Sequence, residues 1–286
     1  MIESKYKNGL IWMNDKLEKV MFLEDISNYL RFSIYDCKDY EKNLKVSDEL
    51  EEYFRFNDWR YIEYDLISEI TSMIIEIFEK GKSFIKIIYY KENEEIKGIE
   101  LRYIPHIKFI KLFDKVYTIQ KFNNKYKFDK YNANECIFLN AKDIRINKIK
   151  TKRILKKLSR YDYMKAIRLS QKGLLSNSLE EENEKERVKI FKTSKEFYWD
   201  ARDNWSKYLN SPYILYRYVK RYLKLISILE KTIYHINKQI KTKIKICNGQ
   251  IIANVKDKKI LNEMLEKILN GTGSYDEISN YIFNKN

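Results

Sequence analysis

The most chemically suggestive stretch of the chain is a basic run, RINKIKTKRILKKLSR, at residues 145–160. It contains no acidic residue, and we expect it to begin as a linker and to become helical near Thr151. Lysine and arginine side chains in this arrangement can neutralise nucleic-acid phosphates without reading sequence, which gives an affinity that falls steeply with salt. The predicted nucleic-acid-binding residues are Arg145, Lys148, Lys150, Lys152, Arg153, Lys156, Lys157 and Arg160.

Two tyrosines, Tyr161 and Tyr163, directly follow the basic run. They can stack on bases, as single-strand binders require, or pack in the core with the inward-facing Ile154 and Leu158. No helix-turn-helix, RRM or zinc-finger pattern accompanies them. The sequence therefore predicts sequence-independent contacts to a nucleic-acid backbone and leaves DNA and RNA both open.

The distribution of charge supports a polyanionic partner. The formal net charge is +15; residues 1–140 carry 23 Lys and Arg against 25 Asp and Glu, and residues 141–286 carry 33 against 16. A bias in codon usage should act on both halves alike, so this segregation indicates that the C-terminal half faces a polyanion. An anionic membrane surface or an acidic protein partner would fit the charge as well.

Carboxylates suggest an alternative, a metal-dependent nuclease or another phosphodiester-acting enzyme. Such chemistry needs two or three carboxylates that converge in the fold. The acidic runs at 92–95 and 180–186 are typical of solvated faces, and the most site-like polar cluster is Asp200 and Asp203 with Arg202 in WDARDNW. The pattern of this cluster favours a helix with a surface ion pair over a catalytic pair, so no catalytic residue is assigned.

Histidine and cysteine are too few and too scattered for a metal site of the usual spacing. His106 and His235 fall in different predicted domains, and neither has a cysteine or second histidine nearby. Cys37, Cys136 and Cys247 are far apart and odd in number, which favours buried free thiols in a reducing compartment. We predict neither a metal nor another cofactor.

Motifs that would indicate other enzyme classes are also missing. The chain has seven glycines and contains no Walker-type phosphate loop, dinucleotide fingerprint or strand-elbow serine motif; GTGS at 271–274 has the pattern of a helix break. No run reaches the roughly 18 apolar residues of a membrane span, and MIESKYKNGL lacks the order of a signal peptide. A cytoplasmic location is therefore expected.

The N-terminal half predicts a helix followed by antiparallel strands. Apolar residues recur at helical spacing from Ile62 to Phe78, and Gly81 is placed to end that helix. Strands are expected at 83–91 and 99–103 around a polar turn, with a bend at Pro105. Further strands at 107–113, 116–122 and 135–139 would continue the meander.

The C-terminal half is dominated by one long helix that restarts at Pro212. Its apolar residues step by four and three, as in a helix packed along another helix, either within the chain or in a second copy or partner. This seam consists of Leu215, Val219, Tyr222, Ile226, Leu229, Ile233, Ile236 and Ile240. A small β-hairpin is then expected around Asn248 and Gly249, followed by two short helices, the second opened by a capping box at 274–277.

These elements predict an α+β protein in two domains. Residues 1–144 would form N-terminal helices and the antiparallel β-meander, and residues 145–286 a basic, mainly helical domain with the heptad-patterned helix 212–240 and a small β-hairpin.

The order of elements in residues 47–144 resembles the wing region of tailed-bacteriophage portal proteins. The pieces that carry the resemblance are Gly81, the Gly98-Ile-Glu-Leu101 strand, the Ile104-Pro105 corner and the Ala141-Lys-Asp-Ile144 stretch. They cover about a third of the chain, which is short for a portal and shows no paired stem helices. The resemblance implies a ring-forming, DNA-conducting assembly without catalytic residues, in a bacterial host cell or a phage particle.

The sequence thus favours a non-enzymatic, nucleic-acid-handling structural protein of a phage or mobile element, bound to nucleic acid through its basic half. The alternatives are the metal-dependent nuclease and a helical protein-interaction module built on the seam at 215–240.

Overall fold

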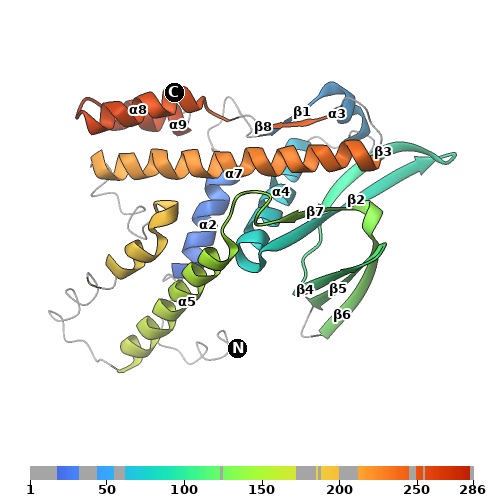
Figure 1. The fold of residues 1–286 in the computed structure, drawn as a ribbon, viewed down its shortest axis with the longest axis horizontal. Helices are drawn as coiled ribbons and strands as arrows, with labels where there is room; N and C mark the ends of the chain where they lie inside the picture. Colours follow the sequence, from blue (N-terminus) through green and yellow to red (C-terminus); the bar gives the residue numbers. More distant parts are fainter. Residues whose placement is uncertain are drawn as a thin grey trace. The chain divides into compact units, whose positions relative to one another are not determined.

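The computed structural model shows an α+β protein, as the sequence predicts (Figure 1). It describes residues 18–31, 44–54, 62–122, 125–171, 185, 188–199, 212–244, 249–253 and 255–283. The chain divides into two compact units, each of which is assembled from separate stretches of the sequence. The helical unit comprises residues 1–29, 149–225 and 256–286, and the sheet unit comprises residues 30–148 and 226–255. From the sequence alone, the boundary is expected at residue 144, with residues 226–255 in the helical part.

Helix α4 (Ile62–Lys80) is the central helix of the sheet unit. Its apolar residues at three- and four-residue spacing, among them Ile70, Met73 and Ile77, are fully buried. Gly81 follows in the left-handed conformation, with φ +80°, and its N–H donates to the carbonyl of Ile77. The predicted helix and its glycine end are both confirmed.

The first sheet has the antiparallel order β3-β2-β7. Its strands are β2 (Lys82–Glu92), β3 (Glu95–Tyr103) and β7 (Cys136–Asn140). The polar turn between β2 and β3 is formed by Asn93 and Glu94, both at positive φ, which matches the twist that tight hairpins require. Strand β7 returns to pair with β2, with Phe84 opposite Phe138, so it does not continue the meander.

The second sheet has the antiparallel order β4-β5-β6. Its strands are β4 (Lys108–Leu112), β5 (Lys115–Phe122) and β6 (Lys125–Asn132), and the short 3-10 helix η2 (Ala133–Glu135) leads on to β7. The chain leaves β3 before Pro105, as predicted. The sequence does not predict strand β6, because KYKFDKYN is rich in charge and its aromatic residues do not alternate regularly: Tyr126 and Phe128 belong to one face of a strand and Tyr131 to the other.

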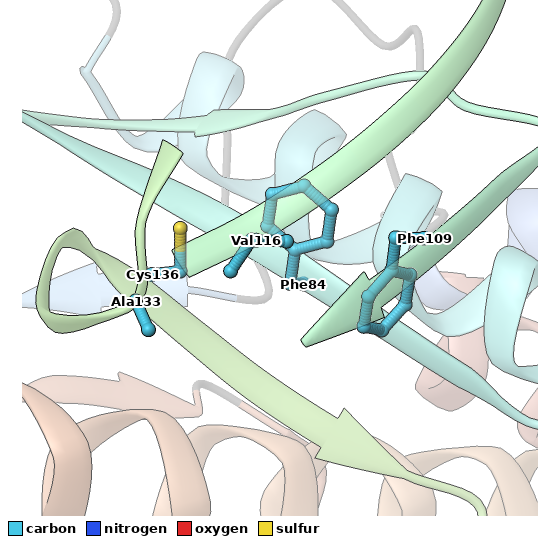
Figure 2. Packing of buried hydrophobic residues seen from close by; sticks show 5 residues of the cluster. All are labelled: Phe84, Phe109, Val116, Ala133 and Cys136. Atoms are coloured by element: carbon cyan, nitrogen blue, oxygen red, sulfur yellow. The ribbon is translucent and has the colours of Figure 1, made fainter. Parts of the chain in front are cut away.

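A buried cluster joins the two sheets (Figure 2). Phe84 from β2 contacts Phe109 from β4 edge-on, with ring centroids 5.1 Å apart, and Val116 and Cys136 complete the cluster with Ala133. Burial raises the pKa of the Cys136 thiol to about 11, so it stays protonated at neutral pH. Cys136 is a buried free thiol, as predicted, and Cys37 and Cys247 lie outside the described residues.

The predicted β-hairpin around Gly249 is wrong. Helix α7 (Pro212–Ile244) takes up the start of its first arm, and residues 245–248 lie outside the described residues. The second arm, β8 (Ile251–Ala253), pairs with β1 (Leu44–Val46), which precedes α3 (Asp48–Phe54). The side chain of Asn237 bonds both the N–H and the carbonyl of Ile251, at 2.9 and 2.7 Å. Strand β8 is therefore held by the backbone of β1, more than 200 residues away in sequence, and by the Asn237 side chain of α7, and not by a neighbouring strand.

All eight residues of the seam on α7 are buried within the chain. Residues 212–225 of this helix belong to the helical unit and residues 226–244 to the sheet unit. The seam therefore packs within the chain in this structure, which is the arrangement that the intramolecular alternative describes.

Besides the first part of α7, the helical unit contains α2 (Glu18–Arg31, up to Tyr29), α5 (Lys148–Gln171, from Ile149 on), the 3-10 helix η3 (Lys195–Phe197), α8 (Lys258–Leu269) and α9 (Tyr275–Phe283). Phe22 on α2 packs edge-on against Phe197 and Trp199, at 5.6 and 5.3 Å between ring centroids. The Trp199 indole donates a 2.6 Å bond to Asp25. Ser274 caps α9 through a 3.1 Å bond from the Glu277 N–H, so this half of the predicted capping box is present.

Replacement of Gly81 by alanine should lower the free energy of unfolding by about 1–2 kcal/mol, because a Cβ at positive φ is strained. The new methyl would also overlap the side-chain carbons of Lys148. Gly271→Ala is the matched control, since Gly271 has φ +72° and nothing within 4 Å of a Cβ. Urea unfolding should show a larger loss for Gly81→Ala than for Gly271→Ala, and Lys148→Ala in the Gly81→Ala background should remove the excess. Equal losses that do not respond to Lys148→Ala would contradict this account.

Candidate nucleic-acid interface

Over residues 151–158, helix α5 places its apolar and basic residues on two different faces. Thr151, Ile154, Leu155 and Leu158 recur at three- and four-residue spacing and are buried. The residues between them are exposed. The apolar stripe therefore fixes the rotation of the helix and directs its cations outward.

Four cations lie together on this outward face: Lys152, Arg153, Lys156 and Lys157. Neighbours at three- and four-residue spacing on a helix repel one another when they carry like charge, at a cost of about 0.2–0.5 kcal/mol per pair. In the described part of the chain no carboxylate forms an ion pair with any of the four. The helix thus maintains a concentrated positive face whose repulsion a bound polyanion would relieve.

The other predicted residues are placed differently. Arg145 is exposed in a left-handed turn, with φ 56°, and Lys148 lies with its alkyl chain against Gly81, both in the sheet unit. Lys150 is 2.8 Å from the carboxylate of Glu196. The side chain of Arg160 lies outside the described residues, and so do those of Tyr161 and Tyr163.

Glu196 anchors the beginning of α5 inside the helical unit. Its carboxylate receives Lys150 from α5 and Lys224 from α7, whose Nζ lies 3.6 Å from Oε1. Lys224 also donates a 2.9 Å bond to the Glu196 carbonyl and sits 4.6 Å above the Phe197 ring. Burial lowers the pKa of Lys224, with Lys150 adding to the effect and Glu196 opposing it. Lys150 and Lys224 therefore serve the fold as well as the surface charge.

Two arginines of α7 bind the backbone inside the same unit, and the sequence does not predict this role. Arg217 and Arg221 are buried, and both donate to the carbonyl of Tyr198, at 3.4 and 2.6 Å. The guanidinium of Arg221 also lies 5.3 Å from the Tyr29 ring. Their i, i+4 spacing beside tyrosines is the signal that could have identified them as structural.

Among the described residues, carboxylates do not converge in a way that would support metal-dependent chemistry. No group of three His, Cys, Asp or Glu able to hold a metal ion occurs among them. Asp200, Arg202 and Asp203 of the WDARDNW cluster lie outside the described residues.

The most site-like buried polar cluster centres on Glu76 of α4, which is 2% exposed. Its carboxylate is 2.5 Å from Lys80 Nζ and accepts a 2.5 Å bond from Ser83. His106 Nε2 lies 3.4 Å from the same carboxylate. An isolated Glu among Met73, Ile74, Ile77 and Phe78 in a buried helix is the sequence signal that could have found it.

The contacts of His106 and its neighbours are those of a structural brace, that is, a polar cluster that holds elements of the fold together, and not those of a catalytic site. Its Nδ1–H donates to the Ile104 carbonyl at 2.7 Å, and its ring packs against Phe84 and Phe109. Burial lowers the pKa of His106, so the ring is neutral at pH 7. Burial and the nearby carboxylates, Glu76 first among them, raise the pKa of Tyr103. The cluster ties α4 to β2 and to the segment after β3, and it includes no activated nucleophile among the described residues.

Comparison with known proteins gives no relative. No family model matches the chain, and no curated protein and no solved structure matches it either. Among the helices that the structure describes, none is both long and apolar enough to span a membrane.

Proposed function

We propose that this protein is a non-enzymatic structural protein that binds the nucleic-acid backbone, without sequence preference, through the outward face of α5. The observation that carries the proposal is the concentration of Lys152, Arg153, Lys156 and Lys157 on one exposed helix face. Four cations that are flexible at their tips suit phosphates, which are evenly spaced and the same in every sequence.

The charge of the chain supports this partner. The excess of Lys and Arg lies after residue 140, and α5 opens with no acidic residue in its first turn. Cations at a helix N-terminus oppose the helix dipole, and Lys150 offsets this cost through its ion pair with Glu196. The support from charge therefore rests on the exposed cations of the following turns.

The proposed setting is a phage or mobile element, with the chain as a portal-like component of an oligomeric assembly. The support for the setting is the sequence pattern of residues 47–144, in which a helix, Gly81, strands and the Pro105 corner follow in an order that resembles a portal wing. Since the seam on α7 is buried, such an assembly would use other surfaces.

The test is the binding of the purified chain to a labelled duplex and a labelled single strand at about 50 mM and about 200 mM salt. Binding by four phosphate contacts should weaken about 100-fold over this range. Absence of binding at the lower salt, or binding that salt does not change, would contradict the proposal. Nucleic-acid cleavage that requires Mg²⁺ or Mn²⁺ and survives repurification would favour the nuclease instead.

A further inference from the structure

The outward face of the β4-β5-β6 sheet exposes an apolar, largely aromatic surface. Strand residues alternate between faces, and the inward positions Phe109, Val116 and Thr118 are buried. The outward positions of the same strands are exposed or half-buried, with Phe128 at 74% and Tyr126 at 63% exposure and Ile119 half-buried. The apolar members of this sheet platform are Ile110, Leu112, Tyr117, Ile119, Tyr126 and Phe128.

The strand register makes the platform continuous. Tyr117 on the central strand stands opposite Ile110 of β4 and Lys130 of β6. Ile119 stands opposite Phe128, and Lys121 opposite Tyr126. Single exposed apolar residues are ordinary on protein surfaces, whereas a contiguous apolar patch marks a binding surface.

Strand β6 shows that folding alone does not account for the platform. Its third aromatic residue, Tyr131, is inward and packs against the buried cluster, but Tyr126 and Phe128 are outward, and the inward positions beside them are Lys127 and Asp129. Lys127 and Asp129 form an ion pair at 3.0 Å, and Asp129 also accepts from Gln120 at 2.9 Å. An edge strand that served only the core would place its aromatic rings inward.

The charges on the platform are all positive. Lys108, Lys115, Lys121 and Lys130 occupy outward positions, and the described outward positions of the three strands include no Asp or Glu. Lys115 is 3.3 Å from Asp114 in the adjoining turn, and Lys130 Nζ lies 5.7 Å from the Tyr117 ring. The surface therefore suits a ligand that carries negative charge together with flat apolar groups.

We propose that the sheet platform binds single-stranded nucleic acid, with bases stacked on Tyr126, Phe128 and Tyr117. Lys108, Lys121 and Lys130 contact the phosphates between them. Aromatic rings on a flat surface with interleaved cations are the recurrent solution to single-strand binding. A duplex cannot use the rings, because its bases are already stacked on one another.

The spacing of the rings fits an unstacked strand. Tyr126 and Phe128 are two residues apart on β6 and so lie roughly 6.7 Å apart along the strand. This is about twice the 3.4 Å per nucleotide of a duplex strand, which suits bases that have been splayed apart. The inference extends the proposed function from backbone contacts on α5 to a second surface, and it rests on that function for the class of ligand.

The test uses the full chain and fluorescence anisotropy with a single strand of about 12 nucleotides and a duplex of the same length. Tyr126→Ala and Phe128→Ala should each weaken single-strand binding about 10-fold, and duplex binding should stay within about 3-fold. Tyr126→Phe should retain the affinity for the single strand, because stacking needs the ring and not the hydroxyl. Tyr234→Ala is the matched control, since Tyr234 is 63% exposed on α7 and lies outside the platform.

Each contrary outcome overturns the inference. Single-strand affinity that Tyr126→Ala and Phe128→Ala leave unchanged excludes the platform, even if α5 still binds duplex. Equal losses on both ligands would mean that the rings do not distinguish strands. A double variant that combines Tyr126→Ala with Phe128→Ala separates the other occupants. If it leaves single-strand affinity unchanged but abolishes binding to vesicles that contain phosphatidylserine, the platform binds a membrane. If it leaves single-strand affinity unchanged but converts a dimer to a monomer in light scattering, the platform binds a second copy. Failure of the proposed function would be a separate result: removal of the α5 cations would change the affinity for neither the single strand nor the duplex.

Discussion

Replacement of Lys152, Arg153, Lys156 and Lys157 together by glutamine is expected to lower the affinity for duplex nucleic acid at about 50 mM salt by at least about 100-fold. The reason is the loss of four phosphate contacts and of the counterions that they release. The slope of log affinity against log salt should become less negative by up to about 3.6, at about 0.9 for each contact. Anisotropy titrations at several salt concentrations measure both quantities.

The matched control removes the same charge elsewhere. Lys185, Lys189, Lys192 and Lys195 are also exposed cations of the helical unit. Their replacement by glutamine changes the net charge by the same amount but leaves the α5 face intact, so we expect a change in affinity of less than about 5-fold. If both quadruple variants lose affinity equally, binding depends on net charge, and α5 is not the interface.

The folded state should tolerate the change in α5. Glutamine has a helix propensity close to that of lysine, and the four side chains lie away from the buried stripe of Thr151, Ile154, Leu155 and Leu158. Relief of repulsion between like charges should raise the melting temperature slightly. A variant that unfolds would instead place these cations in the packing of the helical unit, which their exposure argues against.

The elements that sequence predicts well are those whose signal is local. The spacing of Ile70, Met73 and Ile77 and the position of Gly81 specify a helix and its end, because both depend on neighbours within one turn. The seam of α7 is predicted for the same reason. The β8–β1 pairing joins Ile252 to Lys45, across more than 200 residues, and no local pattern indicates it. Strand β7 likewise pairs with a strand that is far away in sequence, with Cys136 opposite Lys86 of β2.

The candidate interface shows the same division. Periodicity correctly predicts that Lys152 and Lys156 face outward from α5, since the apolar residues determine the rotation of the helix. It does not reveal that Lys150 meets Glu196, or that Arg217 and Arg221 bind the carbonyl of Tyr198. Counting charge overestimates the free surface charge, because partners of this kind are distant in sequence.

The sheet platform is invisible to composition for a further reason. Tyr126 and Phe128 look like ordinary core residues until the parity of β6 is known, and its parity is set by pairing with β5. Once Phe128 is opposite Ile119, Tyr126 and Phe128 are outward and Tyr131 is inward. The register therefore decides which residues are available for function.

Replacement of Glu76 by leucine is expected to lower the free energy of unfolding by about 3–4 kcal/mol. The change removes the partner of Ser83, which is fully buried, and leaves the Lys80 ammonium next to a side chain that cannot accept a bond. Glu76→Gln should cost less, about 1–2 kcal/mol, because its carbonyl oxygen can still accept one of these bonds. Urea unfolding at pH 7 measures the difference.

The contrast between the two Glu76 variants tests the brace itself. Glu52→Gln on α3 is the control, since Glu52 is exposed and its replacement should change the free energy of unfolding by less than about 0.5 kcal/mol. If Glu76→Leu is instead neutral or stabilising, the cluster is a buried ionic group that apolar packing replaces without cost. That result would point away from a structural requirement and toward a chemical role for Glu76 beside His106. A loss that follows the expected order, leucine larger than glutamine and both larger than the control, assigns the cluster to holding α4 against β2 and the segment after β3.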